Sequence, residues 1–262
     1  MRIVFLLMFI LVSVFLLVGE DYTVRWARAF DHGSYDRSYA VAVDGGGNVY
    51  ITGRCFNGVD YDVLTVKYDS LGRLLWVDTL DSGDDDIGYG IAVAGSNVYI
   101  AGALYNGENY DYLTLKYDSS GTLLWADTIA DGGGDDYAKD VALAGDGDVY
   151  VTGQYYWGAA SYDYPLTVKY DSSGNIVWID TLHYSAYARD TYGCGIAVDG
   201  AENVYITGYY RRSGAWDIFT VKYDSAGEQQ WGRDIDIDWY DYSYSVAVDG
   251  GGNVYIGGHF YN

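Results

Sequence analysis

Five aspartates recur at one position of a repeated unit, shortly before an apolar segment in each copy: Asp36, Asp86, Asp136, Asp190 and Asp241. Carboxylates gathered in a ring attract cations, and Ca²⁺ prefers oxygen ligands of this kind. The pattern therefore predicts a cation site, with Ca²⁺ as the one cofactor expected. An alternative stays open, in which each Asp accepts hydrogen bonds from backbone N–H groups of its own turn. The segment DIDID at 234–238 lacks the glycine and distal glutamate of an EF-hand loop.

A second group of residues with binding chemistry lies in two loops that are longer than their counterparts elsewhere in the chain. Its members are Tyr155, Tyr156, Trp157, Tyr209, Tyr210, Arg211 and Arg212. Tyr, Trp and Arg are enriched at binding hot spots, and aromatic rings beside carboxylates suit sugars. We therefore expect a ligand-binding surface here, and ordinary loop packing is the competing interpretation in a chain with 31 tyrosines.

The elements that must position these residues are repeats of about fifty residues. Each repeat ends in a tryptophan, and these are Trp26, Trp76, Trp125, Trp178 and Trp231. Between successive tryptophans stand an alanine-centred apolar strand, the segment NVYITG or a near variant, and the segment TVKYDSxG. Tight turns rich in Gly, Asp and Asn separate these strands, so each repeat predicts four short strands. Repeats of this length and pattern indicate an all-β fold, a β-propeller with one four-stranded blade per repeat.

The repeat resembles a known family. The combination of AxAVDxxGNVYITG with YDxxTVKYDSxGxLLW resembles the SBBP-type bacterial β-propeller repeat, from about Asp21 to Asn262. It is less similar to the delta-60 and NHL repeats, and KYDSSGTLLW looks like the Trp-bearing strand of quinoprotein propellers. The resemblance implies a propeller fold and an extracellular location, and it implies little about activity.

The tryptophans divide residues 20–262 into blades of a single domain. The predicted blades cover 31–80, 81–129, 130–182 and 183–235, and a fifth combines 236–262 with 22–30. We expect the N-terminal strand to close this fifth blade, because a closed ring has no exposed sheet edge. The fifth blade lacks a third strand in this arrangement, which leaves open that the sequence belongs to a longer propeller.

The N-terminal residues predict export. Residues 1–19 combine Arg2 with an apolar run from Ile3 to Val18, the pattern of a signal peptide. Leu17 and Gly19 form a poor cleavage site, so an N-terminal membrane anchor is the alternative. We therefore expect a protein that is secreted or displayed at the cell surface.

Charge restricts the partners of the protein. The 37 acidic and 15 basic residues give a net charge of −22, which repels nucleic acid and anionic membranes. The chain is expected to be a monomer that meets a membrane only through its N-terminal anchor, if that is retained. Cys55 and Cys194 fall in distant repeats and are not expected to form a disulfide.

Two classes of function remain. The leading hypothesis is an extracellular module or scaffold that binds a protein or a glycan, with no catalytic residue assigned. The alternative is a propeller-type glycoside hydrolase or lyase with carboxylates at the mouth of the channel. Such an enzyme needs two carboxylates in unlike environments, whereas the recurring aspartates are equivalent. Three separate loops hold His32, His183 and His259, so a histidine-based site is not expected.

Overall fold

The computed structural model describes residues 11–12, 25–31, 35–130, 133–145, 147–158, 162–182, 189–237 and 239–261. These residues form strands and turns and contain no helix. Accordingly, no apolar helix of membrane-spanning length is found among them. The predicted export segment 1–19 lies outside the described residues except for the short strand β1 (Leu11–Val12).

Four antiparallel four-stranded arrangements follow one another in chain order. The first blade contains β3 (Arg37–Val43), β4 (Val49–Phe56), β5 (Tyr61–Tyr68) and β6 (Leu74–Leu80). The second contains β7 (Asp86–Ala94), β8 (Asn97–Tyr105), β9 (Tyr110–Tyr117) and β10 (Leu123–Ile129). The third contains β11 (Tyr137–Leu143), β12 (Val149–Trp157), β13 (Tyr162–Tyr170) and β14 (Ile176–Thr181). The fourth contains β15 (Arg189–Val198), β16 (Val204–Arg212), β17 (Ala215–Tyr223) and β18 (Gln229–Ile235).

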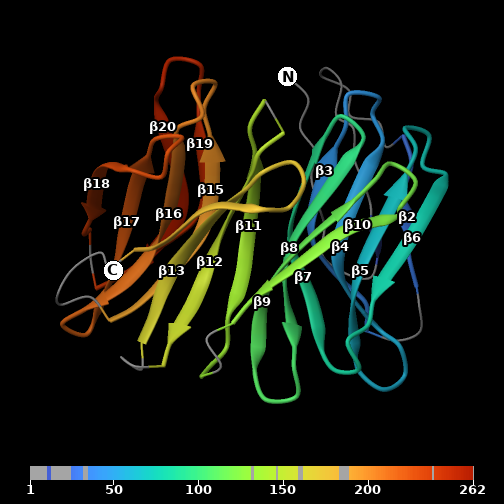
Figure 1. Cartoon of the computed structure of the whole chain (residues 1–262), viewed down its shortest axis with the longest axis horizontal. Coiled ribbons are helices and arrows are strands. Elements are labelled where there is room, and N and C mark those ends of the chain that lie inside the picture. The colour runs from blue at the N-terminus through green and yellow to red at the C-terminus, as the bar shows by residue number, and fades with distance from the viewer. Residues whose placement is uncertain are drawn as a thin grey trace.

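A fifth, shorter unit consists of β19 (Tyr240–Val248) and β20 (Val254–Tyr261), which pair antiparallel. A single bridge between Trp216 and Tyr240 joins β19 to the sheet of the fourth blade. Figure 1 shows the sheets arranged side by side in chain order, from the blue β3 to the red β20. The first strands pack in the same order, β3 on β7, β7 on β11, β11 on β15 and β15 on β19. The prediction of an all-β, multi-bladed propeller is confirmed.

The repeat-invariant residues form the interfaces between blades. In the first blade, the ring of Tyr50 on β4 lies between Lys67 and Trp76, at centroid distances of 4.9 Å and 6.2 Å. The same Trp76 contacts Tyr117 of the next blade at 6.2 Å between ring centroids, and its indole N–H donates to the carbonyl of Ser119 at 3.0 Å. These residues are therefore packing elements, as their recurrence in every repeat predicts.

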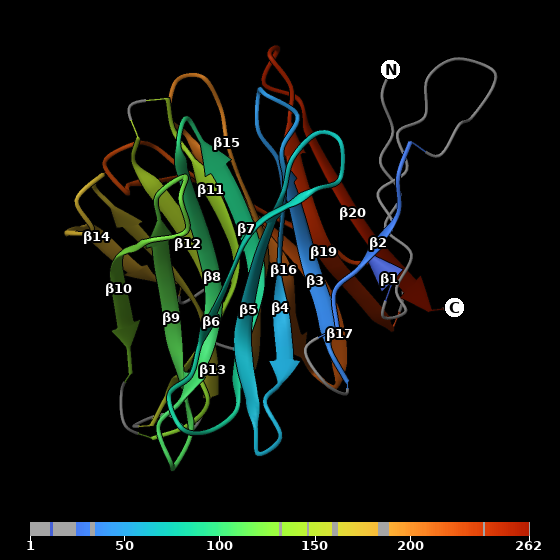
Figure 2. The ribbon, with the colours of Figure 1, turned by 90° about the vertical axis from the view of Figure 1, so that its right-hand side faces the viewer.

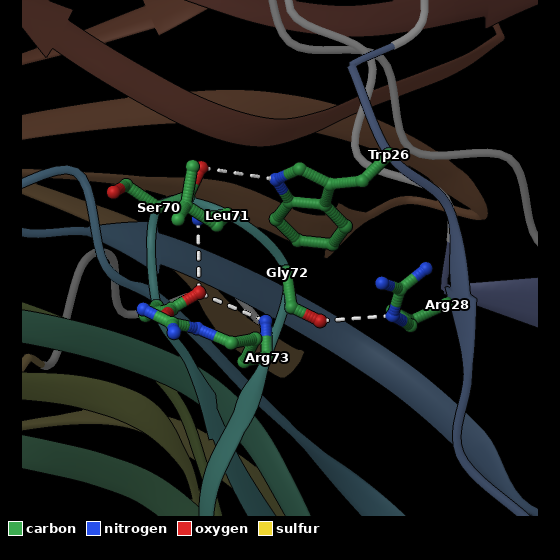
Figure 3. A network of polar contacts seen from close by, with 7 residues as sticks. Trp26, Arg28, Ser70, Leu71, Gly72 and Arg73 are labelled. Carbon is green, nitrogen blue, oxygen red and sulfur yellow. Dashed lines mark hydrogen bonds and ion pairs between the residues drawn. The ribbon is translucent and has the colours of Figure 1, made fainter.

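The N-terminal Trp26 docks on the first blade in the way that Trp76 docks on the second. Its indole N–H donates to the carbonyl of Ser70 at 3.2 Å, and its ring covers Gly72 (Figure 3). Beside it, Nε of Arg28 donates to the carbonyl of Gly72 at 2.9 Å. Trp26 thus occupies the place of an outer-strand tryptophan from a blade that precedes the first.

The pairing of the N-terminal strand differs from the expectation. The two-residue strand β2 (Arg28–Ala29) pairs with β1, and the described residues show no ladder between β2 and β20. The physical reason lies in the order of strands, because the outer strand of each complete blade hydrogen-bonds only to the third strand. Among the described residues β20 has no third strand beside it, so an outer strand has nothing to pair with there.

Candidate functional site

Each of the five inner strands carries a β-bulge at the same position near its N-terminal end. The pairing with the second strand shifts there by one residue, which leaves one residue of the inner strand without an opposite partner. A bulge re-aims the side chain of its unpaired residue. The bulged residues, which we call the bulge arc, are Tyr39, Tyr89, Lys139, Cys194 and Tyr244.

The first three members of the bulge arc contact one another across three blades. The rings of Tyr39 and Tyr89 lie 5.5 Å apart between centroids. The amine of Lys139 lies 3.8 Å from the ring centroid of Tyr89 and 4.2 Å from that of Tyr137. Tyr137 in turn stands edge-on to Tyr89 at 6.1 Å, and 5.2 Å from Tyr110. Two rings of this layer, those of Tyr89 and Tyr137, therefore contact one ammonium group.

The arc continues through Cys194 to Tyr244. The thiol of Cys194 donates to the carbonyl of Tyr192 at 3.8 Å, and both cysteines of the chain are free. Burial raises the pKa of Cys194 to about 12, although the Lys139 amine opposes this shift. The ring of Tyr244 stacks on His259 at 5.5 Å and lies 6.4 Å from Tyr209. The thiol is therefore protonated at neutral pH and behaves as a weak donor.

Electrostatics single out Lys139 within the arc. Burial lowers the pKa of its amine to about 8. None of the ion pairs formed by the described residues includes Lys139, so the two ring faces are its main support. A desolvated cation–π contact contributes about 2 kcal/mol. Moving an ion out of water costs several kcal/mol, so such a contact offsets only part of the desolvation cost of the ammonium. Burial also raises the pKa of Tyr89 to about 12.

Two carboxylates border this layer of rings and differ in burial. Asp135 is exposed and accepts the backbone N–H of Tyr110 at 3.1 Å. Asp163 is half-buried and accepts the side-chain amide of Gln154 at 3.1 Å. Burial raises the pKa of Asp163, while hydrogen bonds from Gln154 and the hydroxyl of Tyr192 oppose the shift. The two acids interact electrostatically, so they belong to one neighbourhood.

The five recurring aspartates hold the loops of their own blades. Asp86 is fully buried and accepts the backbone N–H and hydroxyl of Ser82, each at 2.8 Å, and the N–H of Tyr105 at 3.1 Å. Three others also accept backbone N–H groups, Asp36 that of Phe56, Asp136 that of Tyr156 and Asp241 that of Ile237. Asp190 pairs with Arg211 at 3.8 Å. Asp86 and Asp241 thus accept backbone N–H groups of their own turns, Asp36 and Asp136 accept those of residues twenty positions further on, and Asp190 pairs with an arginine side chain.

Two clusters of three carboxylates occur among the described residues, and they include only one of the five aspartates. The clusters are Asp60, Asp62 and Asp81, and Asp217, Asp236 and Asp241. In the first, the side-chain amide of Asn57 donates to two of the acids, at 2.6 Å and 2.9 Å. In the second, the guanidinium of Arg212 pairs with two of them, each at 2.9 Å. Both clusters thus have donors from the protein itself.

The aromatic residues predicted in the third blade are spread over different environments. Tyr155 packs at the edge of the core between the second and third blades. Tyr156 covers Gly134, and Trp157 stands edge-on to Tyr164 at 6.0 Å. Of the three predicted residues, Tyr155 and Tyr156 are half-buried and Trp157 is exposed. They therefore do not form one continuous platform.

Those predicted in the fourth blade divide between the two sides of β16. Tyr209 contacts Tyr244 of the bulge arc and so belongs to the candidate site. Tyr210 is 1% exposed in the core between the third and fourth blades, so the prediction that it lies on the surface is wrong. Arg211 is exposed beside Asp190, and Arg212 is engaged by the acidic cluster described above. Adjacent residues of a strand point to opposite faces, which explains the contrast between Tyr209 and Tyr210.

Sequence reasoning missed all five members of the bulge arc. A signal was available, because this position carries a Tyr, Lys or Cys between residues that are mostly small in all five inner strands. The prediction looked for variation only in loops.

Comparisons with known proteins agree with the fold. No family model and no curated protein matches the chain. Among solved structures, an ulvan lyase of polysaccharide lyase family PL25 matches with a TM-score of 0.57 and 12% identity, over 89% of this chain and 64% of the lyase. A puromycin hydrolase matches with a TM-score of 0.56 and 10% identity, over 86% of this chain and 36% of the hydrolase. The chain thus spans less than two thirds of either protein, and at these identities the similarity establishes the fold alone.

Proposed function

We propose that the protein is an exported β-propeller module that binds a glycan through the bulge arc, and that acidic saccharides are the preferred class. Export is supported by the pattern of residues 1–19. Binding is supported by the side chains that the five inner strands contribute at one bulged position, of which four are half-buried and Tyr244 is exposed.

The observation that carries the proposal is the Lys139 amine, held between the ring faces of Tyr89 and Tyr137 at 3.8 Å and 4.2 Å. Tyrosine faces stack on the apolar C–H faces of sugars, and their hydroxyls bond to sugar hydroxyls. The carboxylate or sulfate of an acidic sugar would give the Lys139 ammonium the anionic partner that it lacks in the ion pairs of the described residues, so this local contact has to outweigh the repulsion from the net charge of −22. In a poorly hydrated site this charge-assisted hydrogen bond contributes about 1.5–3 kcal/mol.

An array of uronate-containing, sulfated and neutral glycans probed with the full chain tests the proposal. The expected result is preference for the anionic glycans, with affinity lost at least tenfold in Tyr89→Ala. Leu124→Ala is the matched control, because Leu124 is 50% exposed on the outer strand β10, away from the arc. Glycan binding that survives Tyr89→Ala unchanged would place the site elsewhere and overturn the proposal.

A second candidate, a glycoside hydrolase or lyase, is favoured by one observation. Asp135 and Asp163 are two neighbouring carboxylates of unequal burial, the arrangement in which a proton donor and an ionised partner can coexist. The ulvan lyase that shares the fold acts on a polysaccharide, which supports this candidate only by analogy. Incubation of the chain with the glycans that it binds decides between the two functions. Product formation that disappears in Asp163→Asn, with binding retained, would establish the enzyme.

A further inference from the structure

Two arginines of the first blade lie directly opposite each other beside the bulge arc. Arg37 on β3 is the partner of Arg54 on β4 in the register of the two strands. Side chains at such opposite positions point to the same face of a sheet, and like charges there repel each other. The equivalent residues of the fourth blade, Tyr192 and Tyr209, have their rings 5.2 Å apart, which shows how closely side chains at these positions approach. The first blade therefore places two arginine side chains next to each other.

Neither arginine has a carboxylate partner in the ion pairs of the described residues. Nε of Arg54 is also buried and has no hydrogen-bond partner in the part of the chain that the structure describes. Arg73 of the same blade, by contrast, pairs with Asp69 at 2.6 Å. A buried donor without an acceptor costs free energy, so an anion that accepts a hydrogen bond from Arg54 would remove this cost.

Two carboxylates border the arginine pair, and each accepts a backbone N–H group. Asp36 accepts that of Phe56 at 3.3 Å, and Asp85 accepts that of Tyr61 at 3.0 Å. They lower the positive potential around the arginines without forming one of the described ion pairs with them. The guanidinium groups therefore keep their donors for a ligand.

The arginine pair occurs in one blade, whereas the packing residues of this fold recur. Lys67 and Trp76 have equivalents in every complete blade. In place of the two arginines, the next three blades carry Ile87 with Ala103, Tyr137 with Gln154, and Tyr192 with Tyr209. The arginines are therefore not part of the repeated interface between blades.

Aromatic rings join the arginine pair to the bulge arc. The guanidinium of Arg54 lies 4.1 Å from the ring centroid of Tyr61. Burial raises the pKa of Tyr89 and of Tyr110, and the charge of Arg54 opposes both shifts. Figure 2 shows β3, β7 and β11 side by side, and β7 packs on β4 as well as on β11. Tyr89 on β7 therefore lies between Arg54 of the first blade and Lys139 of the third.

The cations on the two sides of Tyr89 cover different rings. Lys139 lies over Tyr89 and Tyr137, whereas Arg54 lies over Tyr61. We infer that Arg37 and Arg54 form a second anion-binding subsite of the bulge arc, which takes an anionic group on one sugar while Lys139 takes one on another sugar. This inference rests on the proposed function and narrows its ligand class to oligosaccharides with anionic groups on at least two sugars.

The chemistry of the subsite suits carboxylates and sulfates. The planar guanidinium donates two parallel N–H bonds to either group, which a lysine ammonium does not match in geometry. The ring of Tyr89 between the two subsites offers an apolar face to the intervening sugar.

Isothermal titration calorimetry of the full chain tests the inference. The probe is a chondroitin 4-sulfate hexasaccharide, whose sugars carry carboxylates and sulfates in alternation, and chitohexaose is the neutral control. A salt concentration of about 0.15 M limits the repulsion from the net charge of −22 to short range. Arg54→Gln and Lys139→Met are each expected to weaken binding of the probe at least tenfold. Arg73→Gln removes one positive charge from an exposed turn and, as the matched control, is expected to bind within twofold of the unmodified chain.

The double variant shows whether two anionic groups are held. If Lys139 and Arg54 bind different groups, their effects are independent and the fold losses multiply, so Arg54→Gln with Lys139→Met is expected to bind at least a hundredfold more weakly. A double variant that binds as well as the weaker single variant would mean that both cations contact one anionic group, which contradicts the inference. Arg54→Lys is expected to bind more tightly than Arg54→Gln, because it keeps the charge.

Failure of this inference and failure of the proposed function give different results. Hexasaccharide binding that Tyr89→Ala abolishes, but that Arg37→Gln and Arg54→Gln leave unchanged, would overturn the second subsite and retain the proposed function. A hexasaccharide that does not bind, while other anionic glycans do, would have the same meaning. Absence of binding to every anionic glycan would overturn both. A lower melting temperature of Arg54→Gln with unchanged binding would identify Arg54 as a packing residue.

Discussion

The amine of Lys139 in the third blade lies 3.8 Å from the ring centroid of Tyr89 in the second, and no described ion pair includes it. The repeat-invariant lysines are arranged differently, since Lys116 combines the ring of Tyr99 with a hydrogen bond of 2.5 Å to the carbonyl of Ser172. In the first arrangement, the described ion pairs give the Lys139 ammonium no carboxylate partner, and it contacts the rings of Tyr89 and Tyr137. The second satisfies its cation within the interface between blades.

Replacing Lys139 separates stability from binding. The pKa of its amine is lowered from 10.5 to about 8 in the folded protein, so the charged form destabilises the fold as pH falls below about 10.5, and the full cost is present below about pH 8. Lys139→Met is therefore expected to stabilise the protein at pH 7 by roughly 1–3 kcal/mol. The same variant is expected to lose affinity for acidic glycans at least tenfold. Thermal unfolding and glycan titration measure the two effects.

The matched control for this prediction is Lys116→Met. It removes a satisfied cation and its hydrogen bond to Ser172, so a loss of stability of about 1–2 kcal/mol is expected, with glycan binding unchanged. Equal destabilisation by Lys139→Met and Lys116→Met would show that Lys139 is a structural residue like the other lysines.

The docking of Trp26 predicts a specific effect of Gly72→Ala. Gly72 has a φ of +77°, and a Cβ atom there would lie 2.6 Å from the Trp26 ring. Gly58 has a φ of +106°, and a Cβ atom there would meet nothing within 4 Å, so Gly58→Ala adds only backbone strain of about 1–3 kcal/mol. Gly72→Ala adds the loss of Trp26 docking to a similar strain.

Limited trypsin digestion at the N-terminal arginines, read by mass spectrometry, distinguishes the two glycine variants. Cleavage after Arg28 is expected to accelerate at least tenfold in Gly72→Ala, because Nε of Arg28 bonds to the Gly72 carbonyl in the docked segment. Gly58→Ala is expected to be cleaved there at the rate of the unmodified chain. Equal rates in all three proteins would mean that Trp26 docking does not protect the segment.

The close approach of two inner strands predicts that the stability of the protein is sensitive to substitution of Gly90. A Cβ atom on Gly90 would lie 2.9 Å from the Cα atom of Asp140 in the next blade, so backbone must move to admit it. Gly90→Ala is expected to lower the free energy of unfolding by about 1–3 kcal/mol, as overpacking of a core does. Chemical denaturation measures this loss. Ala40 occupies the equivalent position of the first blade, and its substitution by Gly is the smaller, control change.

The repeat made most of the fold predictable from the sequence, since turns, strands and packing residues recur together. Trp76 and Lys67 recur at equivalent positions of the four complete blades, and their contacts lie in the packing between strands and blades. The site was harder to predict, because the bulge at Tyr89 breaks the two-residue alternation from which side-chain direction is inferred. Tyr210 illustrates a different error, since alternation alone would have placed it opposite Tyr209.

One buried carboxylate, Asp86, and one half-buried carboxylate, Asp140, predict that the protein is most stable in mild acid. Burial raises the pKa of Asp86 and of Asp140 to about 6. The unfolded chain releases these protons near pH 4, so between about pH 4 and 6 the folded state binds more protons than the unfolded state. Stability is therefore expected to fall as pH rises through this window, by roughly 2 kcal/mol per group. The amine of Lys139 titrates above it.

Below about pH 4, the stability of the protein is expected to fall as the pH is lowered, the opposite of the trend between about pH 4 and 6. Hydrogen bonds from the side chain and backbone of Asn175 lower the pKa of Asp171, so the stability that this turn contributes is lost as pH falls below about 4. The melting temperature is thus expected to peak near pH 4 and to fall between about pH 4 and 6. Asp140→Asn should flatten this decline, and Asp171→Asn should reduce the acid limb alone. A melting temperature that rises steadily from about pH 4 to 6 in the unmodified chain would contradict the assignment of raised pKa values to Asp86 and Asp140.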